Sequence, residues 1–142
     1  MIELSDIQRQ IVVAMLAQAA LAGVLLLMMP APRIAALRAG KVKRDDHGRP
    51  IFPKWTTQIS DAFNNQFQVP TLFYMLCLLI LWLHAESPLL AGMAWVFVAL
   101  RWVHAAVFVT LNVVPIRFAV FLASGLVLLS MLVNVTRRVL GV

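Results

Sequence analysis

The fold of this chain is constrained most by four apolar stretches, each long enough to cross a lipid bilayer. A membrane-spanning helix needs about 20 mostly apolar residues, and four stretches meet that length, at about residues 7–29, 62–83, 89–110 and 113–135. The composition agrees, because 62% of the 142 residues are hydrophobic and only 13% are charged, whereas a soluble domain is nearer half apolar. We therefore predict an integral membrane protein with one domain over residues 1–142.

The connections between these stretches predict how the helices are arranged. Only the first connection, at about residues 31–60, is long, and the other two contain only a few residues. Short connections place successive helices side by side in opposite directions, so we predict an all-α, antiparallel bundle of four transmembrane helices. Pro30 is expected to stop the first helix, while Pro88 and Pro115 occupy first-turn positions, where a missing N–H is tolerated.

The basic residues predict the orientation of the bundle, because Lys and Arg collect at the cytoplasmic ends of membrane spans. Three of them lie on the side of the chain termini, and eight lie on the side of the long connection: Arg33, Arg38, Lys41, Lys43, Arg44, Arg49, Lys54 and Arg117. We therefore expect both termini outside the cytoplasm. The formal net charge of +6 is then a topology signal, and nucleic acid is not an expected partner. The charged segment 41–47 has two interpretations, an anion-binding or headgroup-binding loop and a solvated loop that only sets the topology.

Other chemistries find little support in the residues. Glu3 and Asp6 precede the first apolar run, unlike the positive start of a signal peptide, so the first span is expected to remain uncleaved. A single cysteine cannot form an intrachain disulfide. Asp45, Asp46 and His47 are adjacent in the long connection and lack a useful ligand geometry, so we predict no metal site.

Polar residues open the second span, where a plain membrane anchor would need none. Asp61, Asn65 and Gln68 have the spacing i, i+4 and i+7, which predicts one helical face, and Asn64 forms an overlapping i, i+4 pair with Gln68. Amides at bilayer depth are costly unless they have partners. The cluster therefore predicts either a functional site or a polar network that holds helices together without a ligand.

A second polar face is predicted on the third span. Arg101, His104, Phe108 and Asn112 follow one another at i, i+3, i+7 and i+11, and Arg117 opens the fourth span at the same boundary. Since the second span starts where the third one ends, these groups are expected to surround one volume together with the amides. A guanidinium stays charged and presents a planar fork of donors, so this is an anion-binding set. Two alternatives stay open, a structural pairing of Arg101 with Asp61 in another helix or subunit and a packing role for His104.

These motifs resemble those of the MAPEG family, the membrane-associated proteins in eicosanoid and glutathione metabolism, and in particular its bacterial branch. The usual form there is Asn-x-Phe-Glu-x-Pro-x-Leu-Phe-Tyr, and Gln68 stands here in the place of the Glu. Two segments carry the resemblance: Asn65-Gln-Phe-Gln68-Val-Pro70-Thr-Leu-Phe-Tyr74, and Arg101-Trp-Val-His104 with the later Arg117.

The resemblance implies a homotrimer in a bacterial inner membrane, with glutathione as a co-substrate between neighbouring subunits. It implies that Asn65 and Gln68 hold the peptide, that Arg101 binds a carboxylate or supports the site, and that Arg117 is catalytic. A cation near sulfur lowers the thiol pKa, and the thiolate is the nucleophile. The remaining expected substrate-binding residues are Asn64, His104 and Asn112.

Two functions therefore remain open. The first is a glutathione-dependent transferase or peroxidase acting on a lipophilic electrophile that enters from the bilayer. The second is a noncatalytic membrane protein that binds a lipid or a small anion, or modulates a partner. The position of Arg117 discriminates between them, because catalysis requires its guanidinium to approach a bound sulfur. A transporter is disfavoured, since the chain shows no inverted repeat.

Overall fold

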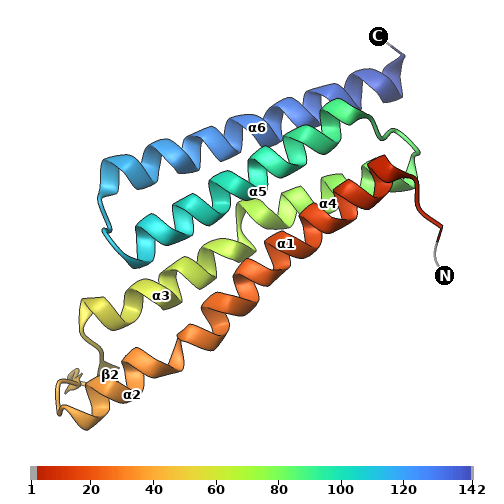
Figure 1. Ribbon diagram of the computed structural model, residues 1–142. Coiled ribbons are helices and arrows are strands. Elements are labelled where there is room, and N and C mark those ends of the chain that lie inside the picture. The colour runs from red at the N-terminus through yellow and green to blue at the C-terminus, as the bar shows by residue number, and fades with distance from the viewer. Residues whose placement is uncertain (1–2, 142) are drawn as a thin grey trace.

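The computed structural model of the chain describes residues 3–141 and consists almost entirely of helices (Figure 1). Successive helical rods run in opposite directions, so that the start of the first rod and the end of the last lie at the same end of the molecule (Figure 1). Four rods are long and apolar enough to cross a membrane: Asp6–Arg38, Lys54–Trp82, Pro88–Val109 and Val114–Leu140. The structure confirms the predicted all-α bundle of four membrane helices.

The first two rods are divided, and the last two are continuous. The divided rods contain α1 (Asp6–Met28) with α2 (Pro30–Arg38), and α3 (Lys54–Asn64) with the short 3-10 helix η1 (Asn65–Phe67) and α4 (Val69–Trp82). The continuous rods are α5 (Pro88–Val109) and α6 (Val114–Leu140).

Local signals in the sequence explain two of the helix starts. Ser5 caps α1, because its hydroxyl accepts from the backbone N–H of Gln8 at 3.2 Å while the Gln8 side chain accepts from the Ser5 N–H at 3.1 Å. This reciprocal pair is a capping box. Ser87 caps α5 through a 3.3 Å bond from the Leu90 N–H, and Pro88 then occupies the first turn as predicted.

The long connection is shorter than the sequence predicts, and the predicted loop over residues 31–60 is wrong at both ends. Pro30 does not end the helical path, because Met29 keeps a helical backbone (φ −61°, ψ −39°) and the proline enters α2 in its first turn. At the other end α3 begins at Lys54, where Thr56, Ile59 and Ser60 form a buried helical stripe. What remains between α2 and α3 carries a two-residue antiparallel ladder, β1 (Lys43–Arg44) with β2 (Pro50–Ile51).

The larger of two apolar clusters lies between the helices in the half of the molecule nearer the chain ends. Phe73 of α4 and Phe97 of α5 are fully buried and stacked, with ring centroids 4.4 Å apart and an angle of 12° between the rings. Cys77 packs into the same cluster as a buried free thiol. A second cluster in the other half joins α5 to α1 and α3, and the buried polar residues Arg101 and His104 lie on that part of α5.

Candidate functional site

The second rod breaks where the amides are. α3 ends at Asn64, η1 follows, and Gln68 has the non-helical dihedral angles φ −98° and ψ −102°. Pro70 explains the break, because a proline removes the N–H that would bond the carbonyl four residues earlier, and its ring clashes with that carbonyl. At the break, the Asn65 carbonyl oxygen accepts from Nη2 of Arg101 at 3.0 Å.

This break corrects the predicted polar face of the second span. Asp61, Asn65 and Gln68 do not share one helical face, because the helical phase changes between the second and the third of them. Asp61 and Gln68 are exposed, and so is Asn64. The Asn65 side chain is half-buried, and its Nδ2 donates to the Asp61 carbonyl at 3.0 Å.

The predicted face of the third span is present in α5 for three of its four residues. Arg101, His104 and Phe108 are 0%, 3% and 7% exposed, and all three face the interior of the bundle. The fourth residue, Asn112, lies beyond the end of α5, in the turn before α6, with a left-handed backbone at φ 48°. The turn nevertheless brings its side chain back toward the same region.

A cavity of about 210 Å³ lies between these groups, at the end of the bundle where α5 joins α6. Polar side chains from three elements reach it, one each from η1, α5 and α6, and aromatic rings form much of the remaining wall. Its lining residues are Asn65, His104, Phe108, Val114, Arg117, Phe118 and Phe121.

Arg117 is held against this cavity from two sides. Its guanidinium carbon lies 4.1 Å from the centroid of the Phe108 ring, which is a favourable cation–π distance. Its Nη1 donates to Oδ1 of Asn112 at 2.7 Å. The predicted Asn112 therefore serves the cavity indirectly, because it positions the arginine and does not line the space itself.

Arg101 lies behind the cavity wall and is fully buried. Its guanidinium carbon is 5.9 Å from the ring centroid of Phe121, which lines the cavity. Within residues 3–141, Nε and Nη1 of Arg101 and Nδ1 of His104 are buried without a hydrogen-bond partner. Buried polar atoms without partners are rare in folded proteins and costly, so this part of α5 has unused hydrogen-bonding capacity next to the cavity.

The charge around the cavity is not neutralised by any acid of the described chain. The single ion pair found among residues 3–141 joins Arg9 to Asp6, far from this region in sequence. Asp61, one acid that could have paired with Arg101, is exposed and forms no ion pair with it in the structure. The guanidinium of Arg117 and the imidazole of His104 therefore line one small volume, with the guanidinium of Arg101 behind its wall, and this arrangement favours an anion.

The structure also reveals a buried amide pair that the sequence prediction missed. Gln18, in the middle of α1, donates from Nε2 to Oε1 of Gln66 at 2.9 Å, and Gln66 donates to the Ala62 carbonyl at 3.0 Å. Both side chains are buried, so the pair ties α1 to the break in the second rod. A signal for Gln18 was present in the sequence, since a glutamine in the middle of an apolar span needs a partner.

We expect Gln18→Leu to destabilise the protein by about 1 kcal/mol, because it leaves Oε1 of Gln66 buried without a donor. The double variant Gln18→Leu/Gln66→Leu is expected to lose less than the sum of the two single losses, since it removes both partners. Thermal unfolding of the purified variants in detergent measures both quantities. Strict additivity would mean that the two amides do not stabilise one another.

The fold and the site together define a multi-pass membrane protein whose four-helix bundle encloses a small, positively charged cavity at one end. A model of the MAPEG family matches residues 13–136, which is most of the chain, so the chain belongs to the MAPEG family. No curated protein and no solved structure gave a significant match to the chain.

Proposed function

We propose that this MAPEG protein binds glutathione and conjugates it to a lipophilic electrophile, or uses it to reduce one. The position of Arg117 carries the proposal. Its guanidinium lines the cavity and is fixed there by Phe108 and Asn112, which is where a thiolate-stabilising cation is needed. Asn65 and His104 line the same cavity and supply the polar groups that a peptide ligand requires.

In this proposal the chain lowers the pKa of the glutathione thiol. The guanidinium of Arg117 stabilises the thiolate, which is the nucleophilic form. The thiol proton is released to water, and the thiolate sulfur attacks the electrophilic carbon. In a substitution the new C–S bond forms as the leaving group departs with its electron pair, whereas in an addition the acceptor becomes an anion that then takes a proton from water. Arg101 supports the site, because its bond to the Asn65 carbonyl fixes the break that brings this residue to the cavity.

We propose that the site is completed by a neighbouring copy in a homotrimer. The cavity of about 210 Å³ in one chain is smaller than the 300–1,000 Å³ typical of ligand pockets. Asn64 and Gln68 are exposed in the single chain, and in the trimer they contribute to the site of the adjacent subunit. The trimer lies in a bacterial inner membrane with both termini outside the cytoplasm, so that glutathione reaches the site from the cytoplasm.

A noncatalytic function is the second candidate, and the position of Gln68 favours it. This residue replaces the glutamate of the usual motif and does not line the cavity of its own chain. Without that carboxylate, the cationic groups around the cavity are suited to a small anion or a lipid headgroup that undergoes no reaction.

A glutathione titration tests the proposal directly. A ligand that binds only the native state stabilises it by about 2.7 kcal/mol at 100 times its Kd, so the thermal midpoint of the detergent-purified protein is expected to rise with glutathione and saturate. S-methylglutathione is the control for the thiol, since it keeps the peptide and removes the nucleophile. A flat midpoint up to millimolar glutathione would leave the noncatalytic function as the better account.

A further inference from the structure

Arg117 is oriented by two neighbours that carry no charge. Its Nη1 donates to the amide oxygen Oδ1 of Asn112 at 2.7 Å, and its guanidinium carbon lies 4.1 Å from the centroid of the Phe108 ring. An amide oxygen and an aromatic face both attract a cation, but neither cancels its charge. Carboxylates are the usual planar partners of a guanidinium, yet no ion pair of Arg117 is found among residues 3–141. The guanidinium is therefore held in place with its full charge.

The cavity to which this guanidinium belongs is lined by no acid of residues 3–141. The other ionisable groups around it are His104, which lines the cavity from α5, and Arg101, which lies behind the wall on the same helix. From η1 the cavity receives Asn65, which is neutral. The charge of Arg117 is thus available to a bound anion, and its effect there depends on what holds the side chain.

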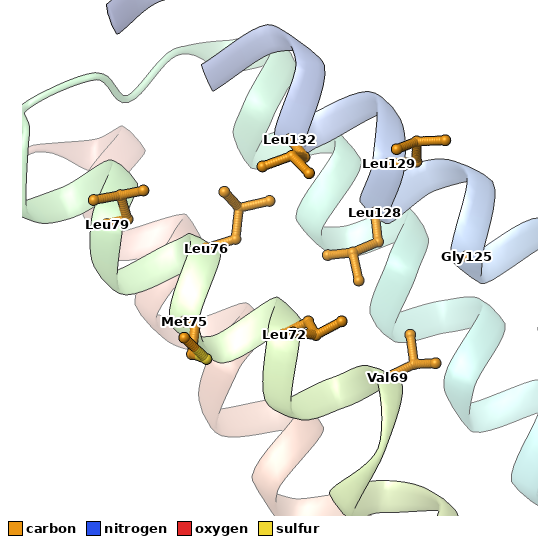
Figure 2. Close-up of a pocket in the computed structure, with 9 residues that line it drawn as sticks. All are labelled: Val69, Leu72, Met75, Leu76, Leu79, Gly125, Leu128, Leu129 and Leu132. Atoms are coloured by element: carbon orange, nitrogen blue, oxygen red, sulfur yellow. The ribbon is translucent and has the colours of Figure 1, made fainter. Parts of the chain in front are cut away.

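The neighbouring surface offers this guanidinium no other polar partner. An apolar groove of about 570 Å³ between α4 and α6 adjoins the cavity (Figure 2), since Val69 begins α4 directly after the break and Gly125 lies one turn after Phe121 of the cavity wall. Every side chain that lines the groove is apolar. In the described part of the chain, the amide of Asn112 is therefore the one side chain that accepts a hydrogen bond from Arg117.

The backbone of the turn between α5 and α6 does not by itself explain an asparagine at position 112. Asn112 has a left-handed backbone at φ 48°, and its N–H donates to the Val107 carbonyl at 2.7 Å. Glycine is the usual residue in this conformation, and asparagine is one of the few alternatives. Glycine would satisfy the turn equally well, but it would not supply the side-chain bond to Arg117.

We propose that Asn112 is a positioning residue, which fixes the Arg117 guanidinium beside the bound thiol and leaves its positive charge uncancelled. This inference rests on the proposed glutathione function. A carboxylate at position 112 would hold the same nitrogen but cancel its charge, and a glycine would keep the turn but release the side chain. An amide meets both requirements, so Asn112 controls how readily the thiol loses its proton to water.

Asn112→Asp tests the role of the neutral partner. The carboxylate is expected to pair with Arg117 and to raise the pKa of the bound glutathione thiol by at least about 1, since an opposite charge within about 6 Å shifts a pKa by about 1–3. The ultraviolet absorbance of the bound thiolate, measured against pH, reports this pKa. The conjugation rate with a chlorodinitrobenzene electrophile is expected to fall about tenfold below the thiol pKa of the parental complex and to approach the parental rate at high pH, where the thiolate forms unaided. A merely structural defect would not be repaired by raising the pH.

Asn112→Gly tests the role of the hydrogen bond, and His84→Gly is its matched control. His84 has the same left-handed backbone, at φ 49°, in the turn at the opposite end of α5, so neither glycine is expected to lower the thermal midpoint. Asn112→Gly is expected to lower the conjugation rate about tenfold, the effect of losing a hydrogen bond to a charged group, with the Kd for glutathione nearly unchanged. His84→Gly is expected to leave the rate and the pH profile unchanged.

Three outcomes would overturn the inference. If the parental protein binds glutathione and forms its thiolate, but both Asn112 variants keep the parental pH profile and rate, then Asn112 has no positioning role and the proposed function stands. Equal losses from Asn112→Gly and His84→Gly would assign the effect to the flexibility of the turns. A parental protein that binds no glutathione would remove the inference together with the proposed function, so the two failures are distinguishable.

Discussion

Arg117→Gln is expected to lower the rate constant for glutathione conjugation by about 100-fold to 1,000-fold, the usual loss when a preorganised group that stabilises reacting charge is removed. The affinity for glutathione is expected to change much less, because Asn65 and His104 still line the cavity. Steady-state kinetics with a chlorodinitrobenzene electrophile measures the first quantity. The ultraviolet difference spectrum of the bound thiolate provides a readout that does not depend on the electrophile.

Two companion variants make this prediction specific. Arg117→Lys retains the charge but not the planar fork, so its rate is expected to fall between those of the parent and the glutamine variant. Arg137→Gln removes a charge at the other end of α6 and is expected to leave the rate unchanged. If Arg117→Gln conjugated glutathione at the parental rate and gave the same thiolate spectrum, this residue would have no catalytic role.

The four membrane helices could be predicted from the sequence because each needs only a sufficient length of apolar residues. The break at residues 65–68 could not, although Pro70 was visible, since a proline is also compatible with the first turn of a helix. The same ambiguity affected Pro30, which was expected to stop a helix and instead lies in the first turn of α2. Helix existence follows from composition, while helix continuity depends on tertiary contacts such as the Arg101 bond to the Asn65 carbonyl.

The candidate site was predictable only where one unbroken helix carries it. Arg101, His104 and Phe108 lie together on α5, and their spacing was sufficient to place them on one buried face. The amides of the second span could not be placed by spacing, because the helical phase changes at η1 and buries Gln66 in preference to Gln68. The contact between Asn112 and Arg117 depends on a turn, which no periodicity describes.

The burial of Arg101 is expected to lower the stability of the ligand-free protein, and this expectation distinguishes a functional role of the residue from a structural one. A guanidinium in a low-dielectric interior costs several kcal/mol unless it is fully paired. Among residues 3–141 this group makes one hydrogen bond, and its Nε and Nη1 have no partner. Such a residue destabilises the free protein, and proteins keep destabilising residues mainly where function requires them.

Arg101→Met is therefore expected to raise the thermal midpoint of the free protein by a few degrees while abolishing the glutathione-dependent rise. The loss of one hydrogen bond to the Asn65 carbonyl costs about 1 kcal/mol, which is less than the relief from removing a buried charge. The thermal midpoint with and without glutathione, together with the oligomeric state in detergent, measures both effects. We expect the assembly to stay intact, because the fold does not depend on an ion pair at this position.

A comparison with Gln18→Leu makes the sign of the change in thermal midpoint decisive. Both substitutions replace a fully buried polar side chain by an apolar one, and both side chains are only partly bonded, since Oε1 of Gln18 also has no partner among residues 3–141. The difference is that the glutamine is neutral, whereas the arginine carries a charge that is costly to bury. A structural role for both would lower both thermal midpoints. A lower midpoint for Gln18→Leu with a higher one for Arg101→Met would assign the glutamine to the fold and the arginine to the ligand. If Arg101→Met instead lost several degrees and fell apart into monomers, its guanidinium would serve mainly to hold the broken rod against α5.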